Sequence, residues 1–364
     1  MTPTPVSSST SSRELPDFWR KLHRLVGFQK GYNFLLWSIF GVGSLAFTLS
    51  RAPYLDYFGV FCRKNFLSSG NHAAPGECYY FLNGGREQIG MMLHLYSIIP
   101  CCFLVFLQFV PLVRHRFVLF HRINGYVVVL LMSVAIVSGL MALSESFGGD
   151  PAWLAAVTIH SIMIITGLFL AMLNIKMLQI EQHRAWMLRT WIWAFCTISM
   201  RIIQQIGVRV LSNKGYVALK PCAQIASDGV LSVSVIVQHF PNCAAYFSGE
   251  NMGQMVVVEA NYFGLPIEIN VALSFAAGAS AFLALILHIL GAELYLHLTP
   301  AESDRLRQVS YHKQLAAGMR HPGRAGLTVD RVGDALRWSP CVEEKIDLDS
   351  DVVSLVSHET CRKP

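Results

Sequence analysis

Two histidines stand at matching positions in two apolar segments of the sequence. His94 precedes Gln108 by fourteen residues, and His160 precedes Asn174 by the same fourteen. Because fourteen residues are close to four helical turns, each imidazole shares a helix face with its amide. Imidazoles on two facing helices can supply both axial ligands of a haem iron. The spacing therefore suggests a bis-His haem b site in which His94 and His160 are the metal ligands.

The alternative is that each histidine bonds to a polar neighbour and holds no cofactor. Arg201, Gln204 and Gln205 lie at a similar depth on one later segment. A guanidinium inside an apolar segment needs a protein-lined or wet cavity and an acceptor, for which Glu87 and Glu268 are candidates. An anionic or carbonyl-bearing ligand would suit such a pocket, and a structural Arg–Glu tie explains the same residues. The expected polar core comprises Gln108, Asn174, Arg201 and Gln204.

Two His-Arg pairs follow these amides, in "FHRINGY" and "EQHRAWMLRT". The order histidine, amide, His-Arg thus occurs twice, which favours a tandem repeat of two helical hairpins. Arginines at the ends of spans can contact lipid phosphates or cap neighbouring helix ends, whereas the histidines are candidates for a proton relay or a phosphate contact. The residues expected at this inner interface are His121, Arg122, His183, Arg184 and Arg189.

Other catalytic motifs are absent from the sequence. It contains no glycine-rich phosphate loop, no His-Glu-x-x-His, no Cys-x-x-Cys and no Asp-rich motif of the kind that prenyl-diphosphate enzymes use to hold magnesium. The net charge of +6 fits the negative inner leaflet of a membrane better than nucleic acid. We therefore expect the lipid bilayer, and no nucleic acid, as a partner.

Membrane-spanning helices must position these residues. Of the 364 residues, 53% are hydrophobic and 14% are charged, against about 25% charged residues in ordinary soluble chains. A spanning helix needs roughly 20 mostly apolar residues, because its backbone must satisfy its own hydrogen bonds. Six stretches qualify, at 31–50, 89–111, 123–143, 152–175, 185–208 and 268–290.

We predict an all-α integral membrane protein with six transmembrane helices and a four-helix core formed by spans two to five. The stretch 228–240 is apolar but too short to span, so it should lie on the surface or re-enter, and seven spans are the alternative. The predicted parts are a cytoplasmic segment at 1–30 without a cleaved signal, a six-span domain at 31–290 with long outer loops at 51–88 and 209–266, a cytoplasmic amphipathic helix at 291–320 and a disordered cytoplasmic tail at 321–364.

The short loops indicate the orientation. Lys and Arg stay preferentially on the cytoplasmic side, and residues 112–122 hold three of them whereas 144–150 hold none. Both termini are therefore expected in the cytoplasm. The final helix has a clear start, because Thr299 can cap it, Pro300 suits its first turn and Glu302 completes a capping box. The polar sequence after Pro322 predicts disorder.

Cysteine positions agree with this topology. Four of the nine cysteines fall in the two long outer loops, where oxidising conditions favour disulfides. Three pairings are open, and pairing within each loop is the simplest. The candidates are Cys62, Cys78, Cys222 and Cys243. Cys341 and Cys361 should stay reduced in the tail, and the sequence holds no Asn-x-Ser/Thr glycosylation acceptor.

Several segments resemble one family of multi-pass membrane proteins. They include "HLYSIIPCCFLVFLQFVPLVRHRFVLFHRINGYVVVLL", "NIKMLQIEQHRAWMLRTW" and "CAAYFSGENMGQMVVVEA". The family is grouped as domain of unknown function 2306, and its longer fungal members resemble this chain from about Cys78 to Asp334. The resemblance implies a multi-pass membrane fold and a set of site residues, but no established reaction. Those residues are His94, Gln108, His121, Arg122, His160, His183, Arg184, Trp186, Met187, Arg189 and Arg201.

Three classes of activity are compatible with these observations. The leading hypothesis is a haem redox protein that passes electrons or oxidises a lipophilic compound. The second is a cofactor-free membrane carrier, binding protein or scaffold, and the fungal resemblance suggests that it could serve a secondary-metabolite pathway. The third is an intramembrane enzyme that uses histidine as acid or base. The sequence indicates no oligomeric state.

Overall fold

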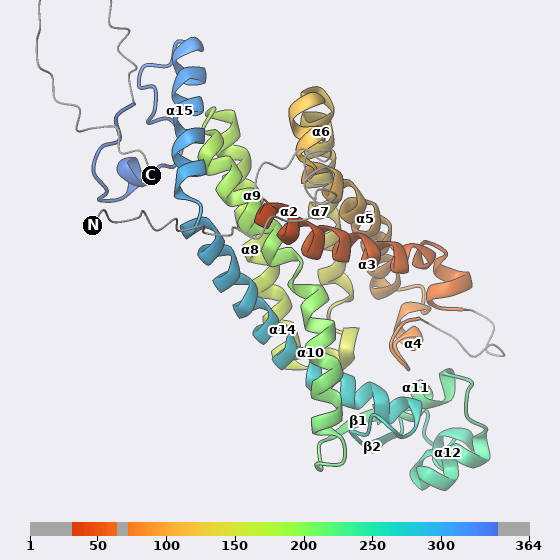
Figure 1. The fold of residues 1–364 in the computed structure, drawn as a ribbon. Coiled ribbons are helices and arrows are strands. Elements are labelled where there is room, and N and C mark those ends of the chain that lie inside the picture. Colours follow the sequence, from red (N-terminus) through yellow and green to blue (C-terminus); the bar gives the residue numbers. More distant parts are fainter. Residues whose placement is uncertain (1–30, 64–71, 341–364) are drawn as a thin grey trace, which may run out of the picture.

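The computed structural model describes residues 31–63 and 72–340. The predicted segment at 1–30, the end of the tail at 341–364 and its two cysteines lie outside the described residues. Within them, five helices are long and apolar enough to cross a membrane (Figure 1). They are Gly31–Leu55, α5 (Arg86–Gln108), α7 (Val118–Ala142), α8 (Pro151–Lys176) and α14 (Pro266–His297).

The fifth predicted span, at 185–208, is divided into two shorter helices. α9 (Ile180–Ala194) has 15 residues and α10 (Cys196–Leu211) has 16, and they are separated at Phe195. Neither helix alone reaches the roughly 20 residues that a bilayer requires. The all-α character of the apolar region is therefore confirmed, whereas the count of six continuous spans is not.

The first span is a composite helix that crosses the others obliquely (Figure 1). It consists of α2 (Gly31–Trp37), the π-helical turn η1 (Ser38–Val42), α3 (Gly43–Arg51) and the short helix η2 (Ala52–Leu55). Its Trp37 ring lies 5.4 Å from the Phe106 ring on α5. The hydroxyl of Tyr295 on α14 donates to Asn33 Oδ1 at 3.2 Å. The span thus contacts helices on both sides of the bundle.

The remaining long helices form two groups that pack closely. α5 pairs with α7, while α8 packs with α9 and α14, and α10 packs with α14. A Cβ on Gly90 of α5 would lie 2.7 Å from the Cβ of Met141 on α7. A Cβ on Gly278 of α14 would lie 2.6 Å from the Cβ of Ala152 on α8. Such close approach between membrane helices needs residues without side chains at the crossing point.

α14 belongs to the core, which is therefore larger than the predicted bundle of spans two to five. One continuous apolar cluster draws buried residues from α5, α7, α8, α9, α10 and α14. α14 contributes mostly small residues, including Ala277, Ala284 and Ala292. Their size lets the neighbouring backbones approach, which a hydropathy pattern alone does not indicate.

One end of the bundle, here called the disulfide end, consists of residues 52–63, 72–85, 143–149 and 212–265. It contains η3 (Tyr57–Phe61), α4 (Cys78–Phe81), η4 (Ser146–Gly149), α11 (Cys222–Ser227), α12 (Val233–His239), η5 (Pro241–Cys243) and α13 (Ala244–Phe247). The only sheet in the described chain pairs β1 (Val217–Pro221) antiparallel to β2 (Met255–Glu259), with Leu219 opposite Val257.

The two simplest disulfide pairings are confirmed. Cys62 and Cys78 are joined with their sulfurs 1.98 Å apart, and Cys222 and Cys243 with theirs 1.94 Å apart. The short apolar stretch 228–240 forms α12, whose Ile236 is buried in the core of the disulfide end. This stretch packs on its own end of the molecule and adds no further spanning helix.

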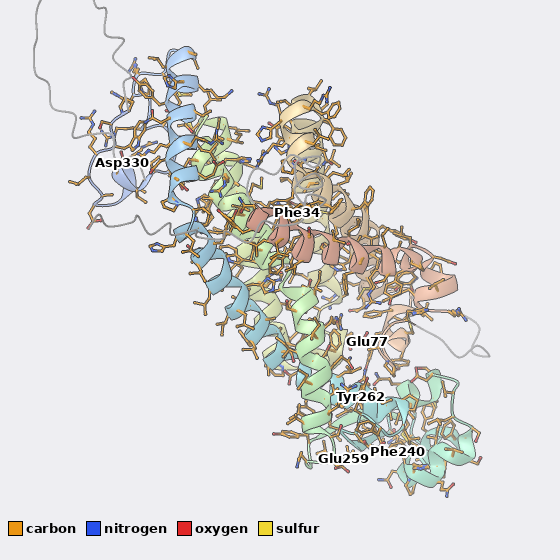
Figure 2. The ribbon with its side chains drawn as sticks, viewed as in Figure 1. Phe34, Glu77, Phe240, Glu259, Tyr262 and Asp330 are labelled. Carbon is orange, nitrogen blue, oxygen red and sulfur yellow. A yellow bond between two sulfur atoms is a disulfide. The ribbon has the colours of Figure 1, made fainter. Side chains whose placement is uncertain are left out.

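The opposite end, here called the tail end, consists of residues 109–122, 177–184 and 298–340. It contains α6 (Pro111–Arg116), α15 (Pro300–Ala316) and α16 (Val329–Val332). The predicted disorder does not extend through residues 321–340, because this segment folds back onto the helices. Gly323 N–H donates to Gln314 Oε1 at 2.7 Å, and Arg307 pairs with the buried Asp330. Figure 2 labels Asp330 beside α15.

Candidate functional site

His94 ties α5 to α7. Its Nδ1 lies 2.8 Å from the carbonyl oxygen of Ala135 on α7. The ring rests against Gly139, where a Cβ would come within 2.9 Å of that nitrogen. Because a carbonyl only accepts, the imidazole donates its Nδ1–H, which fixes both the tautomer and the ring orientation. The histidine thus joins the two helices of its own hairpin, at a carbonyl that also accepts from the Ser138 hydroxyl at 3.3 Å.

His160 plays the same part in the second hairpin. Its Nε2 lies 3.1 Å from the carbonyl oxygen of Trp193, next to the interruption at Phe195. His288 on α14 donates through Nδ1 to the neighbouring carbonyl of Ile192 at 2.5 Å. The two histidines therefore donate to the carbonyls of consecutive residues from two different helices, α8 and α14.

A third side chain completes this set. The hydroxyl of Thr197 donates to the carbonyl of Ala194 at 3.2 Å. Where a helix is interrupted in the hydrocarbon region, its freed carbonyls need other donors, because no water is present to replace them. Side chains on α8, α14 and α10 supply those donors here, which explains how α9 and α10 can be separated inside an apolar bundle.

These hydrogen bonds do not fit a bis-His haem. His160 donates through Nε2, so that nitrogen has no free lone pair for iron. His94 retains a free Nε2, but it packs within the α5–α7 pair, whereas His160 serves the α8–α9 pair. An axial pair needs two lone pairs directed at one point between facing helices. The haem hypothesis accordingly gains no support from the arrangement of its two candidate ligands.

Gln108 and Asn174, the two amides of the expected polar core, bond to backbone groups of different segments. Gln108 donates to the carbonyl of His121 at 2.9 Å. Asn174 donates to Leu170 O at 2.8 Å and accepts from the N–H of Leu327 in the tail, also at 2.8 Å. Each amide therefore fixes one helix end or the tail, and the two do not meet in a shared pocket.

The inner-interface residues divide into paired and unpaired groups. His183 donates through Nδ1 to Ala171 O at 2.9 Å. Arg189 forms a two-pronged ion pair with Glu293 on α14, at 2.6 and 2.8 Å. Arg184 has one long hydrogen bond, 3.4 Å to the hydroxyl of Thr299, and Arg122 is exposed on the first turn of α7.

A group of charged side chains without close ion pairs lies at the disulfide end, around Glu77. This carboxylate is 6% exposed, and Figure 2 labels it at the junction between the bundle and the disulfide end. It accepts hydrogen bonds from the backbone N–H of Phe147 at 2.7 Å and of Ala74 at 3.2 Å. Two cations, Arg201 and Lys220, are close enough to act on it electrostatically.

Arg201 reaches this group from α10. Its guanidinium lies 4.6 Å from the centre of the Phe147 ring and donates to Gln204 Oε1 at 3.4 Å. Gln204 is held in turn by a bond to the carbonyl of Leu273 on α14, at 3.0 Å. The expected association of Arg201 with Gln204 therefore occurs, without His94 or His160.

The carboxylate nearest to Arg201 differs from the two expected ones. Glu87 pairs with Arg86 at 3.1 Å, and Glu268 accepts from the N–H of Leu265 at 2.8 Å. Glu77 takes their place, because the loop that follows the first span folds inward at this point. Both expected partners are used locally at the starts of their own helices.

Phe147 connects the carboxylate and the guanidinium. It adopts a left-handed backbone conformation with φ of 49°, which is uncommon for a residue other than glycine. This conformation directs its N–H to Glu77 while its buried ring lies under Arg201. An uncommon backbone geometry held by surrounding contacts is frequent at binding sites.

Burial shifts the titration of the groups outside the spans. It raises the pKa of Glu77 above its ordinary value, against the opposing effects of the Phe147 N–H and of Arg201. Burial lowers the pKa of Lys220, while Glu77 and then Glu145 act in the other direction. No ion pair within 4.0 Å joins Glu77 to either cation in the described chain. The site therefore holds a carboxyl and two cations without close neutralising pairs.

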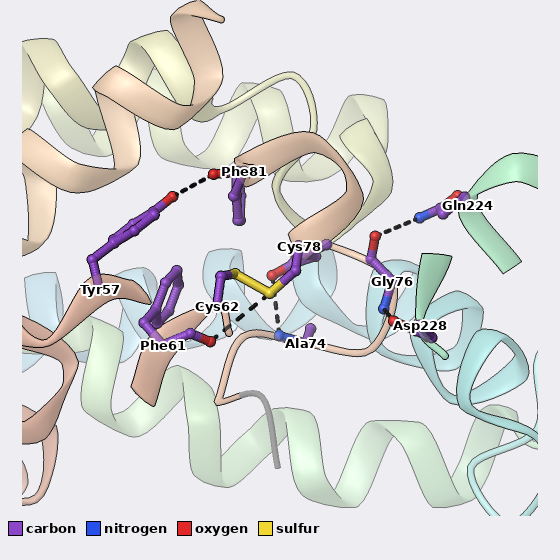
Figure 3. Close-up of a disulfide and its surroundings, with 10 residues drawn as sticks. Tyr57, Phe61, Cys62, Ala74, Gly76, Cys78, Phe81, Gln224 and Asp228 are labelled. Atoms are coloured by element: carbon purple, nitrogen blue, oxygen red, sulfur yellow. Dashed lines mark hydrogen bonds between the residues drawn. A yellow bond between two sulfur atoms is a disulfide. The ribbon is translucent and has the colours of Figure 1, made fainter. Parts of the chain in front are cut away.

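The Glu77 loop is anchored on both sides, as Figure 3 shows. Gly76 N–H donates to Asp228 Oδ1 at 3.0 Å, and Gln224 Nε2 donates to Gly76 O at 3.2 Å. The disulfide from Cys62 to Cys78 follows directly. Because Gly76 has a φ of 77°, a residue with a side chain would be strained there. These contacts join the two disulfide-bonded loops and position Glu77.

Sequence reasoning missed three residues of these sites. Glu77 and Lys220 lie in loops, where a charged residue normally indicates a solvated surface. His288 lies inside the last apolar stretch, and an ionisable residue within a span was an available signal of a special role.

Comparisons with known proteins agree with this architecture. Residues 91–240, from α5 to the end of α12, match the family described as "Predicted membrane protein (DUF2306)". The chain is also 26% identical over 323 aligned residues to the "Ava biosynthesis cluster protein G" of Aspergillus versicolor, with 78% of this chain and 94% of that relative covered. No solved structure matches the chain. The chain is thus a multi-pass membrane protein, and its resemblance to fungal membrane proteins of the DUF2306 family is confirmed.

Proposed function

We propose that this protein binds a small lipophilic compound bearing an anionic or carbonyl group, with Arg201 as the anchoring residue. It would act without a cofactor, as a membrane binding or carrier protein that serves a fungal secondary-metabolite pathway.

The hydrogen-bonding state of Arg201 carries this proposal. A guanidinium has five N–H donors, and in the described chain Arg201 uses one of them, in the 3.4 Å bond to Gln204. The side chain lies in the first half of α10 and is exposed there rather than sealed in the core. A charged residue at membrane depth is costly unless it has a partner. An anionic or carbonyl-bearing ligand would supply the missing acceptors.

The surroundings of Arg201 suit a lipophilic compound. The ring of Trp153 packs edge-on against Phe147, with the ring centres 4.9 Å apart, and its buried Nε1–H has no acceptor in the described chain. Glu77, whose pKa is raised by burial, can hold a proton and donate it in a hydrogen bond to a carbonyl oxygen. Aromatic walls with a few directed polar groups are typical of small-molecule sites.

The similarity to a biosynthesis cluster protein supports the pathway assignment. The relative is described by its place in a cluster, and its alignment covers nearly its whole length. A lipophilic intermediate partitions into membranes, so a membrane protein that holds it would keep it near the enzymes that act on it.

We further infer that α9 and α10 together make the sixth crossing, with the disulfide end outside and both termini in the cytoplasm. The two helices pack in sequence along α8 and α14, which are spanning helices. Disulfides favour an oxidising compartment for their end, and Arg114, Arg116 and Arg122 favour the cytoplasm for the other.

This topology can be tested by glycosylation, because the natural sequence has no acceptor motif. Gly253→Thr creates an acceptor at Asn251 in the disulfide end, and Leu315→Asn with Ala317→Thr creates one in the tail end. We expect only the first to be glycosylated in microsomes. Modification of the second alone would reverse the orientation, and modification of both would contradict the even number of crossings.

Photocrosslinking tests the ligand site. Membranes containing the full chain are treated with a diazirine-bearing decanoate, and labelled peptides are identified by mass spectrometry. We expect labelling near Phe147 and Trp153 that unlabelled decanoate competes away and decanol does not. Arg201→Gln should abolish it. Arg209→Gln is the matched control, because Arg209 lies on the same helix but hydrogen-bonds to the Gln205 carbonyl and lies over the Tyr262 ring, away from Phe147.

The competing outcomes are distinct. Equal labelling of the wild type and Arg201→Gln would refute the anchoring role. Labelling spread evenly over lipid-facing residues would indicate simple partitioning and favour a scaffold. Loss of labelling in Arg209→Gln as well would indicate a general effect of surface charge.

A further inference from the structure

A second group of unbalanced cations lies at the tail end, far along the bundle from Glu77. Arg114 on α6, Arg184 on α9 and Arg305 on α15 come from three separate elements. They approach one another closely enough that Arg184 and Arg305 both act electrostatically on Arg114. Three like charges brought together by different helices are unfavourable without an anion between them.

The nearest carboxylate does not neutralise this group. Glu302 is held by Arg305 in a two-pronged pair, with both bonds at 2.8 Å. Arg114 and Arg184 have no carboxylate within 4.0 Å in the described residues. Arg184 is positioned instead by the 3.4 Å bond to Thr299 and by the ring of Tyr295, 5.9 Å from its guanidinium. Glu181 also lies within electrostatic reach of Arg184, and three arginines facing two glutamates leave the group with a net positive charge.

The imidazole of His121 also indicates a missing ligand near these arginines. Nδ1 of His121 is buried and has no hydrogen-bond partner in the described chain. The side chain lies within electrostatic reach of Arg114 and His183. Its backbone is fixed, because Gln108 donates to the His121 carbonyl at 2.9 Å. A buried polar atom without a partner normally indicates a missing ligand or water.

The depth of this group matches a lipid headgroup. Its neighbours at the start of α7, Val118, Leu119 and Phe120, are large apolar side chains exposed on the outer surface of the bundle. Because apolar exposure of this kind belongs in hydrocarbon, the cationic group lies where the hydrocarbon region ends. Phosphate groups of the adjacent leaflet occupy that level.

We propose that Arg114, Arg184, Arg305 and His121 form a binding site for a phosphate monoester group. The group has a net positive charge, and arginines from several directions suit the tetrahedral oxygens of a phosphate better than a planar carboxylate. The group can belong to an anionic lipid such as phosphatidic acid or to a free phosphate compound. This site is separate from Arg201, and neither proposal depends on the other.

Calorimetric titration of the full chain in detergent tests the site. The probes are dioctanoyl phosphatidic acid, dioctanoyl phosphatidylcholine and inorganic phosphate. We expect phosphatidic acid to bind at least about tenfold more tightly than phosphatidylcholine, and Arg114→Gln or Arg184→Gln to weaken it about tenfold each, since one charge-assisted hydrogen bond contributes roughly that factor. Arg116→Gln, on the same short helix, should leave the affinity unchanged.

The three probes distinguish a lipid ligand from a free phosphate, and the variants show whether the site exists. If inorganic phosphate binds as tightly as phosphatidic acid and Arg114→Gln weakens both, the ligand is a free phosphate and the lipid is excluded. If phosphatidic acid and phosphatidylcholine bind alike, or if Arg114→Gln and Arg116→Gln have equal effects, the site does not exist. Arg114 is exposed, so its substitution should not impair folding, and Arg184→Lys keeps the charge if Arg184→Gln is unstable.

Discussion

Replacing His160 by alanine provides the most direct test of how the bundle tolerates the interruption between α9 and α10. The imidazole donates to the Trp193 carbonyl at 3.1 Å, one residue before the end of α9 at Ala194. In His160→Ala the carbonyl would lose this side-chain donor in an apolar region. The substitution should therefore destabilise the folded protein.

The expected magnitude follows from two effects. A buried acceptor left without a donor costs about 1–3 kcal/mol, whereas hydrogen bonds between membrane helices average about 0.6 kcal/mol with a maximum near 1.7. His160 is half-buried, so the cavity left by its removal adds little. We expect a loss of about 1–2 kcal/mol in the free energy of unfolding.

The assay is reversible unfolding in mixed micelles with increasing dodecyl sulfate, followed by tryptophan fluorescence. His160→Gln should recover part of the loss, because an amide can also donate to the carbonyl. The matched control is His239→Ala, since His239 bonds to the Val235 carbonyl at 3.0 Å but is exposed. This control should stay within about 0.5 kcal/mol of the wild type.

A double-substitution cycle makes the test sharper. His288 serves the adjacent Ile192 carbonyl, so His160→Ala and His288→Ala act on one interruption and should be non-additive by more than about 0.5 kcal/mol. If His160→Ala is as stable as His239→Ala, and the two losses simply add, the carbonyl explanation is wrong.

Three further predictions concern the two ends of the molecule. Gly76→Ala should destabilise the disulfide end by about 1–2 kcal/mol, because its Cβ would lie 3.0 Å from Gln224 Nε2 at a φ of 77°. The control is Gly84→Ala, which has the same φ but open space around it. Equal calorimetric melting temperatures of the two variants would show that the contact with Gln224 is unimportant. Because burial raises the pKa of Glu77 above 4.5, the folded state binds its proton more tightly than the unfolded state, and stability should fall as pH rises above 4.5. Glu77→Gln should flatten this part of the curve of stability against pH. An unchanged slope would contradict the raised pKa of Glu77. Asp330→Asn should release residues 320–340, because it leaves the buried Arg307 guanidinium unpaired. Trypsin should then cleave this segment faster than in Asp334→Asn, the control variant at an exposed position. Equal cleavage rates would show that the ion pair does not hold the tail.

The sequence was sufficient for the parts of the fold that depend on composition. Five of the six predicted spans appear, because hydrocarbon imposes length and apolarity directly, although the last one, Pro266–His297, ends seven residues beyond its predicted end at 290. The disulfide pairs are the simplest of the three pairings that the loop assignment left open. By contrast, the interruption at Phe195 was not predictable from residue type, since "TWIWAFCTIS" contains neither glycine nor proline. Its stability comes from His160 and His288 on other helices.

The candidate site was also predicted only in part from the sequence, for a different reason. Spacing placed His94 and Gln108 on one helix face correctly, but a face has several neighbours, and periodicity does not say which one a side chain meets. The opposing partners are backbone carbonyls, which every residue carries and no sequence pattern marks. The tail was misjudged likewise, because its polar composition hides the few contacts by which Asn174, Gln314 and Asp330 hold it.

The distribution of hydrogen bonds indicates where function should be sought. The intramembrane histidines, which first suggested chemistry, donate to backbone carbonyls, as His94 does to Ala135 and His160 to Trp193. Their replacement should change stability more than any ligand affinity. Arg201 and Arg114 are different, because each lies near a carboxylate yet forms no close ion pair in the described chain. Since an arginine at membrane depth gains nothing for the fold without an acceptor, these two residues, and not the histidines, are where a bound anion would act.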